Sequence, residues 1–271
     1  MSKSTNLPNN IDGKWIKELY TSENSIIEKK FEDLIKLSEE GIGLSFYLVR
    51  EMETVLHDEY DKTKVHLTES SLCKYMLFRK TIHYLNSTLL LARNGHMDSS
   101  YSCLRTVMEN IWMLYFLKIS TNYVTEQFFE REKNIASKQA INKNIRKEFN
   151  NFSPYFLRNR LYSTKKREQV YNLYKDLSGF THSSIIGSLN EFKFNLEVTE
   201  DILKYELKLS VSTLCVGYEL YPKAVSVEFN DKINNYINTV SQKVGHLFDL
   251  IPNNLLVIPH LLIPEYLSIE L

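Results

Sequence analysis

The chain has 271 residues, of which 43% are hydrophobic and 24% charged, as in a globular protein that buries a substantial core. Its 33 lysines and arginines balance 33 aspartates and glutamates, which excludes a uniformly basic or uniformly acidic protein. Only 8 glycines and 6 prolines interrupt long stretches rich in Leu, Ile, Lys, Glu and Asn, and this disfavours a many-stranded β fold. We therefore predict an all-α fold, a single multi-helix bundle of about eight helices.

Eight segments carry apolar residues at the helical spacing of three and four positions. The expected helices cover residues 22–41, 44–56, 68–93, 99–119, 125–149, 164–182, 199–221 and 230–250. The fourth segment is the most apolar and is expected at the centre of the core.

Glycines, a proline and a polar stretch define the expected boundaries. The first helix should stop near Gly41 and Gly43, and the second should break in the polar stretch HDEYDKTK. Gly95 should end the third helix, and Pro154 should end the fifth.

No sharp change in composition divides the chain, so one helical domain is expected. Residues 1–20 lack a strong apolar pattern and are expected to form a flexible N-terminus. Residues 21–250 should form the helical bundle. Residues 251–271 contain Pro259 and Pro264, which forbid a regular helix, and this irregular C-terminal tail is expected to pack on the bundle.

The compartment is expected to be the cytoplasm. The cysteines Cys73, Cys103 and Cys215 lie far apart in the sequence and are typical of buried thiols in a reducing environment. The longest apolar run, Ile111–Leu117, is far shorter than the ~20 residues of a membrane span, so no membrane association is predicted. No cofactor motif is present, and the pair in Glu53–His57 is weak evidence for a metal, so neither a cofactor nor a metal is assigned.

The stretch YKDLSGFTHSS carries three polar residues one helical turn apart. Tyr174, Ser178 and His182 would form a single ribbon along one face of a helix. Such a ribbon either closes a buried network or points into a site, and the spacing alone leaves both interpretations open.

A charged pair interrupts the most apolar helix. Arg105 and Glu109 are four residues apart and therefore share a face. Burial of either charge alone would be costly, so each should be paired or reach a polar cavity. The pair is either an intrahelical salt bridge at the edge of the core or part of a site that also contains the ribbon of the later helix.

Positive charge is concentrated between residues 131 and 168, where 11 lysines and arginines face 3 glutamates. Aromatic residues are interleaved with these cations, a combination typical of single-stranded nucleic acid surfaces. A solvated helix face followed by a loop with core aromatics fits the pattern as well. The candidate nucleic-acid-binding residues are Lys143, Arg146, Lys147, Arg158, Arg160, Lys165, Lys166 and Arg167.

The motifs ARNGHMDSSYSCLRTVMEN, FFEREK and YKDLSGFTHSS together resemble a family of uncharacterised bacterial all-helical proteins. In that family a helix with an Arg and, four residues on, a Glu precedes a segment with Tyr, Ser and His at matching spacing. The resemblance covers roughly residues 72–184. The matching residues, which it implies as site residues, are Arg105, Glu109, Tyr174, Ser178 and His182.

The same family is similar in outline to the HEPN superfamily of helical bundles. Many HEPN proteins are metal-independent ribonucleases of toxin and phage-defence systems, and their usual mark is an Arg followed after four to six residues by a His. This chain departs from that mark, since only three residues separate Arg79 from His83. The Arg and the His of a site would therefore come from separate helices. The resemblance also implies a homo-oligomer with a basic cleft between two copies.

Two functions follow as hypotheses. In the first, the protein is a nucleic-acid-directed effector with ribonuclease activity, in which His182 transfers a proton and Arg105 holds the phosphate. Glu109 would orient the Arg or the imidazole, while Tyr174 and Ser178 would position the RNA substrate or hold the tautomer of the imidazole. In the second, the protein is a non-catalytic helical module for a partner protein or a small ligand, and the polar residues form a buried specificity network.

Overall fold

The computed structural model describes residues 13–63, 69–136, 152–162, 164–179 and 196–244, and these contain nine α-helices and no strand. The helices are α1 (Gly13–Lys30), α2 (Glu32–Thr63), α3 (Glu69–Arg93), α4 (Met97–Ile119), α5 (Asn122–Ala136), α7 (Pro154–Leu161), α8 (Thr164–Gly179), α10 (Leu196–Leu220) and α11 (Val227–Val244). A short 3-10 helix, η2 (Pro222–Ala224), connects the last two. The predicted all-α helical bundle is confirmed.

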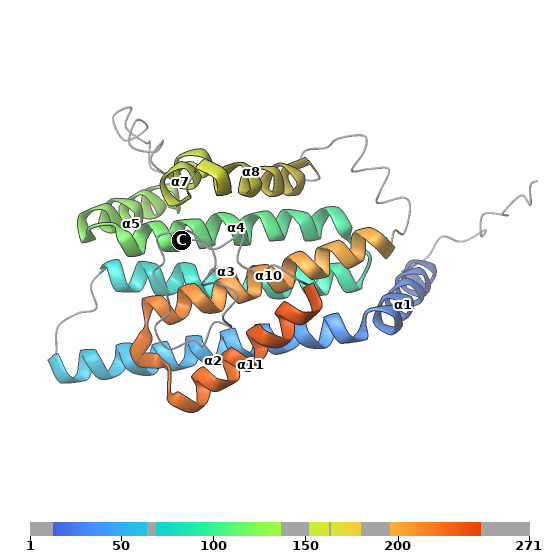
Figure 1. Cartoon of the computed structure of the whole chain (residues 1–271), viewed down its shortest axis with the longest axis horizontal. Helices are drawn as coiled ribbons and strands as arrows, with labels where there is room; N and C mark the ends of the chain where they lie inside the picture. Colours follow the sequence, from blue (N-terminus) through green and yellow to red (C-terminus); the bar gives the residue numbers. More distant parts are fainter. Residues whose placement is uncertain (1–12, 64–68, 137–151, 163, 180–195, 245–271) are drawn as a thin grey trace, which may run out of the picture.

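The long helices lie side by side along the long axis of the molecule (Figure 1). Helix α3 packs between α2 and α4, and α10 packs against all three. Helices α7 and α8 cover α4 on the side away from α2, and α11 lies against α2 and α10. The outermost layer of the bundle, formed by α7 and α8, therefore rests on α4.

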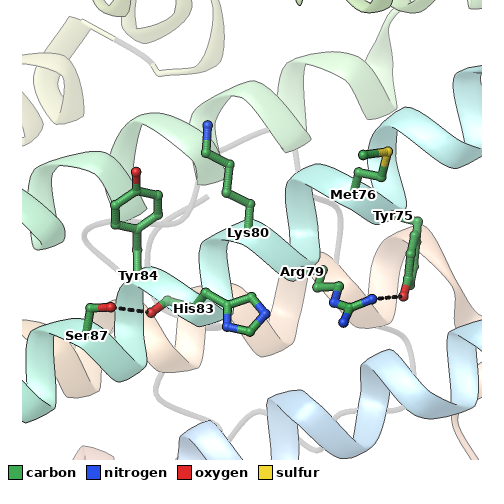
Figure 2. Close-up of a pocket in the computed structure, with 7 residues that line it drawn as sticks. All are labelled: Tyr75, Met76, Arg79, Lys80, His83, Tyr84 and Ser87. Carbon is green, nitrogen blue, oxygen red and sulfur yellow. Dashed lines mark hydrogen bonds between the residues drawn. The ribbon is translucent and has the colours of Figure 1, made fainter. Parts of the chain in front are cut away.

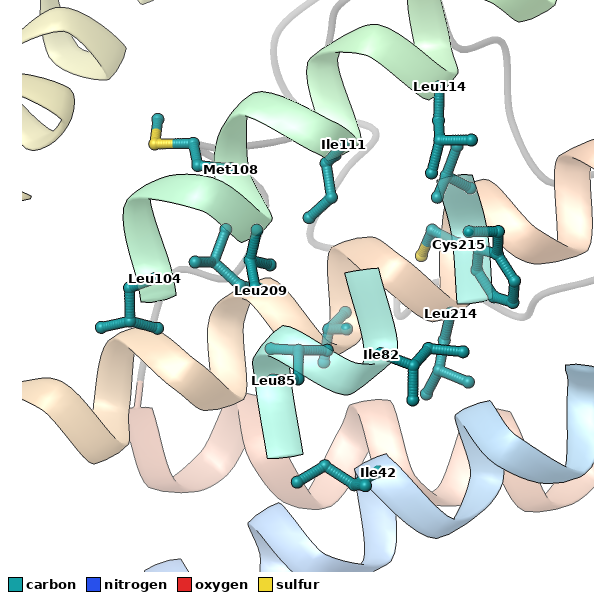
Figure 3. Packing of buried hydrophobic residues seen from close by; sticks show 14 of the residues in the cluster. Ile42, Ile82, Leu85, Leu104, Met108, Ile111, Leu114, Leu209, Leu214 and Cys215 are labelled. Carbon is teal, nitrogen blue, oxygen red and sulfur yellow. The ribbon is translucent and has the colours of Figure 1, made fainter. Parts of the chain in front are cut away.

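Helix α4 lies at the centre of the core, as its apolar sequence predicts. Every residue from Ile111 to Leu117 is buried, so this segment is covered on all sides. Figure 3 shows apolar side chains of α2, α3, α4 and α10 meeting in one cluster, with Ile42, Ile82, Ile111 and Leu214 among them. The packed α4 gives the outer helices a rigid base.

The predicted break at Gly41 and Gly43 is wrong. The helix is interrupted ten residues earlier, at the buried Phe31, where α1 ends and α2 begins. Helix α2 then continues through both glycines. Gly41 is needed for close packing instead, because a Cβ atom here would overlap the Tyr236 hydroxyl and the Ser210 Oγ of the neighbouring helices. Helix α1 begins at Gly13, inside the segment expected to be flexible.

Helix α2 ends at Thr63, within the polar stretch HDEYDKTK where a break was predicted, although it runs seven residues beyond the expected end at Leu56. The polar side chains of this stretch suit an exposed helix end, where His57 forms a contact of 3.2 Å with Asp61 one turn later. The stretch contains neither glycine nor proline, so most of it can continue the helix.

Other expected boundaries are observed. Gly95 ends α3 with a positive φ of 78°, and His96 N donates to the Leu91 carbonyl over 2.9 Å. Pro154 begins α7, a short helix that was not predicted from the sequence, while the expected end of the fifth helix near residue 149 lies outside the described residues. Ser153 followed by Pro154 is a typical sequence signal for the start of a helix. In the structure the Ser153 side chain caps α7 by accepting a hydrogen bond from Phe156 N. The expected tail, residues 251–271, lies outside the described residues.

The expected buried thiols are observed at Cys73 and Cys215, while Cys103 is half-buried. Burial raises the pKa of Cys215 to about 12, so this thiol stays protonated and belongs to the core. None of the described helices combines the length and the apolar character that a membrane crossing requires.

Candidate functional site

Three of the predicted site residues meet where α8 lies on α4. The Arg105 Nε donates to Glu109 Oε1 over 2.9 Å within α4. From α8, the Tyr174 hydroxyl donates to the same Glu109 oxygen over 2.6 Å. The Arg105 guanidinium carbon lies 5.2 Å from the centre of the Tyr174 ring. We call these three residues the α4–α8 cluster.

The packing of α4 explains why the cluster forms at this position. Arg105 and Glu109 share the helix face that α8 covers, and Trp112 occupies the next turn of that face. The Trp112 ring lies 5.4 Å from the Tyr174 ring, centre to centre, and its Nε1 donates to the Tyr162 hydroxyl over 2.9 Å. Trp112 is buried and therefore supports the cluster from the core side.

The cluster lies at the edge of the core. The side chains of Arg105 and Glu109 are 27% and 31% exposed, so solvent or a ligand can reach them. Burial and the hydrogen bond to Glu109 raise the pKa of Tyr174 to about 12, so its phenol is a hydrogen-bond donor at neutral pH. Burial lowers the pKa of Arg105, but the hydrogen bond and charge of Glu109 outweigh it, and the pKa is raised overall. The guanidinium therefore remains charged.

The other two members of the predicted site are not joined to the cluster in the same way. Ser178 is on α8, and its hydroxyl donates to the Tyr174 carbonyl over 2.7 Å, a bond that serine commonly makes within a helix. His182 lies outside the described residues. The structure thus confirms that Arg105 and Glu109 meet Tyr174 across the helix pair. The catalytic role of His182 stays a prediction.

The predicted nucleic-acid-binding residues have different surroundings. Lys143, Arg146 and Lys147 lie outside the described residues, and of Lys165 and Lys166 only the backbone in the first turn of α8 is described.

Three arginines of this set have described side chains. Arg167 donates to the Asn159 and Tyr162 carbonyls over 3.0 and 3.2 Å and so joins the end of α7 to α8. Arg160 is exposed. Arg158 is buried, and its guanidinium carbon lies 4.3 Å from the centre of the Tyr171 ring. Arg167 therefore has a structural role, which the concentration of positive charge in the sequence did not reveal.

Tyr171 and Tyr162 were not predicted as site residues from the sequence. Tyr171 precedes Tyr174 by three residues and lies on the same side of α8, so the helical spacing that identified the polar ribbon could have identified it as well. Tyr162 follows the end of α7 and could not be assigned without knowledge of that helix.

A separate groove of about 480 Å³ lies along α3 (Figure 2). Its lining residues are Tyr75, Met76, Arg79, Lys80, His83, Tyr84 and Ser87. Arg79 donates to the Tyr75 hydroxyl over 3.3 Å, the Tyr75 hydroxyl donates to Glu53, and His83 lies edge-on to Phe46. The closest HEPN-like spacing in the chain, Arg79 to His83, thus lies in this groove and not in the α4–α8 cluster.

Within the described part of the chain, no group of three or more His, Cys, Asp or Glu side chains could hold a metal ion. No protein-family model matches the chain, and neither a curated protein nor a solved structure matches it. The family resemblance therefore rests on the quoted motifs alone.

Proposed function

We propose that the protein is an RNA-directed, HEPN-like effector of a bacterial defence or toxin system, with metal-independent ribonuclease activity at the α4–α8 cluster. The observation that supports this proposal is the convergence of Arg105, Glu109 and Tyr174 from two helices at the edge of the core. A guanidinium, a carboxylate and a protonated phenol at one partly exposed position are groups suited to phosphoryl transfer.

The proposed reaction is an internal attack within RNA. The 2′-oxygen of one ribose attacks the adjacent phosphorus, the bond to the 5′-oxygen of the next nucleotide breaks, and a 2′,3′-cyclic phosphate forms. The 2′-hydroxyl loses a proton and the leaving 5′-oxygen gains one. His182 is the proposed group for one of these transfers, since an imidazole titrates near neutral pH.

The described residues would act on the phosphate. Arg105 would stabilise the negative charge that grows on its oxygens, while Glu109 holds the guanidinium in place through its 2.9 Å hydrogen bond. Tyr174 would remain protonated, because its pKa is raised to about 12, and would position Glu109 or donate to the substrate. Its part would therefore be orientation, not proton removal.

A second candidate function is a non-catalytic helical module that binds a partner protein or a small ligand. The favouring observation is that Arg105, Glu109 and Tyr174 already satisfy one another and are supported by Trp112. In that case the cluster fixes α8 on α4, and the ligand binds elsewhere, as in the groove along α3. A second copy of the chain, as the resemblance implies, is proposed as a partner for either function.

The test is incubation of the purified protein with total cellular RNA in the presence of EDTA. Parent protein should release fragments that end in 2′,3′-cyclic phosphate. Arg105→Ala should lower the rate about 100-fold, the loss typical for one charge-stabilising group, and His182→Ala should lower it as strongly. The matched control is Arg79→Ala, an arginine of the α3 groove outside the cluster, which should cleave at the parental rate.

Thermal melting separates the two candidate functions. Variants that retain the parental melting temperature but do not cleave support the catalytic proposal. If the parent does not cleave RNA and Arg105→Ala melts at a lower temperature, the cluster has a structural role and the protein is the non-catalytic module of the second candidate function.

A further inference from the structure

An arginine with no carboxylate partner among the described residues lies between the outermost helices. Arg158 of α7 is only 9% exposed, and its Nε is buried without a hydrogen-bond partner. Its guanidinium carbon lies 4.3 Å from the centre of the Tyr171 ring and 5.5 Å from that of Tyr155. No carboxylate among the described residues forms an ion pair with it. A desolvated cation in this position attracts an anion, because two aromatic rings offset only part of its lost hydration.

The two tyrosines are partly open to solvent. Tyr155 is 68% exposed and Tyr171 is 45% exposed, although large aromatic side chains are usually covered. We call Tyr155, Arg158 and Tyr171 the tyrosine–arginine patch. It offers ring faces beside a positive charge, and nearby Arg160 is exposed as well. Rings that stack on bases and cations that pair with phosphates are the two components of single-strand binding surfaces.

The patch adjoins the α4–α8 cluster. Tyr171 and Tyr174 are three residues apart on α8, so their side chains emerge from the same side of that helix. The Tyr174 ring in turn lies beside Arg105. A chain of aromatic and guanidinium groups therefore leads from the exposed Tyr155 to the charged pair of α4.

We propose that the tyrosine–arginine patch binds single-stranded RNA, with bases stacked on Tyr155 and Tyr171 and a phosphate paired with Arg158. The identity of the strand as RNA rests on the proposed function, since the patch leads to the site of the proposed cleavage. The rings can stack only on unpaired bases, so duplex RNA should bind more weakly. A protein surface is the less favoured partner, because a single-stranded nucleic acid supplies both flat bases for the two rings and a phosphate for Arg158.

The experiment measures binding separately from cleavage. The full chain is titrated into a fluorescein-labelled 12-nucleotide oligouridylate with 2′-O-methyl groups, which cannot undergo the proposed reaction, and anisotropy is recorded. Tyr155→Ala and Tyr171→Ala should each weaken binding about tenfold or more, as the loss of one stacked base predicts. Tyr155→Phe keeps the ring and should bind as the parent does.

Two further variants sharpen the test. Tyr47→Ala removes a tyrosine of α2 that is 46% exposed, matched to Tyr171 but away from α7 and α8, and it should leave binding unchanged. Arg158→Gln should lower the slope of log Kd against log salt concentration by about 0.7, the value for one phosphate contact on a single strand. Thermal melting shows which variants fold as the parent does.

The outcomes also separate this proposal from the proposed cleavage. Equal affinity of the parent, Tyr155→Ala and Tyr171→Ala overturns the RNA patch, even if natural RNA is cleaved. No binding by the parent overturns it as well, and a change in self-association of Tyr155→Ala without a change in RNA affinity assigns the patch to a protein contact. Binding that depends on the tyrosines, without cleavage of natural RNA, supports RNA binding by the tyrosine–arginine patch and contradicts the proposed ribonuclease activity.

Discussion

Glu206 is a carboxyl group with no exposed surface in the interior of the bundle. It lies on α10 and is close to Ser38 of α2 and Tyr236 of α11. Burial raises its pKa to about 8, and the opposing influence of Ser38 is smaller. Apart from the Ser38 hydroxyl, neither carboxyl oxygen has a hydrogen-bond partner within the described residues. A protonated acid is the form that such a position tolerates.

This pKa predicts a pH-dependent stability. Between its usual pKa near 4.5 and the folded value of about 8, the unfolded chain releases the proton while the folded chain keeps it, so stability falls as the pH rises. Below this window and above it the contribution is constant. The free energy of unfolding of Glu206→Gln, measured by urea titration, should therefore exceed that of the parent by about 3 kcal/mol at pH 7, and most of this difference should disappear at pH 4.5.

Glu126→Gln is the control for this prediction, because Glu126 is exposed on α5. It should leave the pH dependence of unfolding as in the parent. A parental pH profile for Glu206→Gln would show that the buried acid is paired in solution. The burial of Glu206 could not be predicted from the sequence. The polar residues Thr199, Ser210 and Thr213 lie on the same face of α10, and a face with this composition is typical of an exposed helix surface, although all of them are buried.

At the scale of the helix, α2 shows that a glycine predicted to end a helix can instead allow close packing between helices. Gly41 lies where α2 meets α10 and α11, and an added Cβ would be 2.5 Å from Tyr236 Cζ. Tyr236 is buried and cannot move away without disturbing the core. Two residues later Gly43 is exposed, and an added Cβ would meet no atom within 4 Å.

The two glycines therefore predict opposite effects of the same substitution. Gly41→Ala should destabilise the protein by about 2 kcal/mol through overpacking. Gly43→Ala should stabilise it by about 0.5–1 kcal/mol, because alanine favours the middle of an exposed helix. Urea unfolding of both variants checks the pair, and a stabilising Gly41→Ala would mean that the helices do not pack this closely.

The helix content and the ends of α3 and α4 could be predicted from apolar spacing and from Gly95, since these are local signals. The pairing of Arg105 with Glu109 followed from their four-residue spacing. The continuity of α2 could not be predicted, because it depends on side chains of α10 and α11 that contact Gly41. The stacking of Arg158 on Tyr171 likewise depends on how α7 turns into α8.

At the scale of the whole molecule, the bundle has a thick core and a thinner outer layer. Helices α3, α4 and α10 pack on several neighbours each, whereas α7 and α8 rest mainly on α4 and on each other. The contacts of this layer include the hydrogen bond from Tyr174 to Glu109 and the Trp112 ring. Regions with fewer packed neighbours open at a lower free energy than the core.

We therefore expect amide hydrogen exchange to be faster in α7 and α8 than in α10, and Tyr174→Phe to widen the difference. This variant keeps the ring and removes the hydroxyl that donates to Glu109, a partly exposed hydrogen bond worth about 1 kcal/mol. Exchange in α8 should accelerate about fivefold, while exchange in α10 stays parental. Tyr171→Phe, on the same helix with a partly exposed ring, is the matched control and should exchange as the parent does. Equal acceleration in α8 and α10 would mean that the outer layer and the core unfold together, and an unchanged α8 would mean that the α4–α8 cluster does not hold the layer in place.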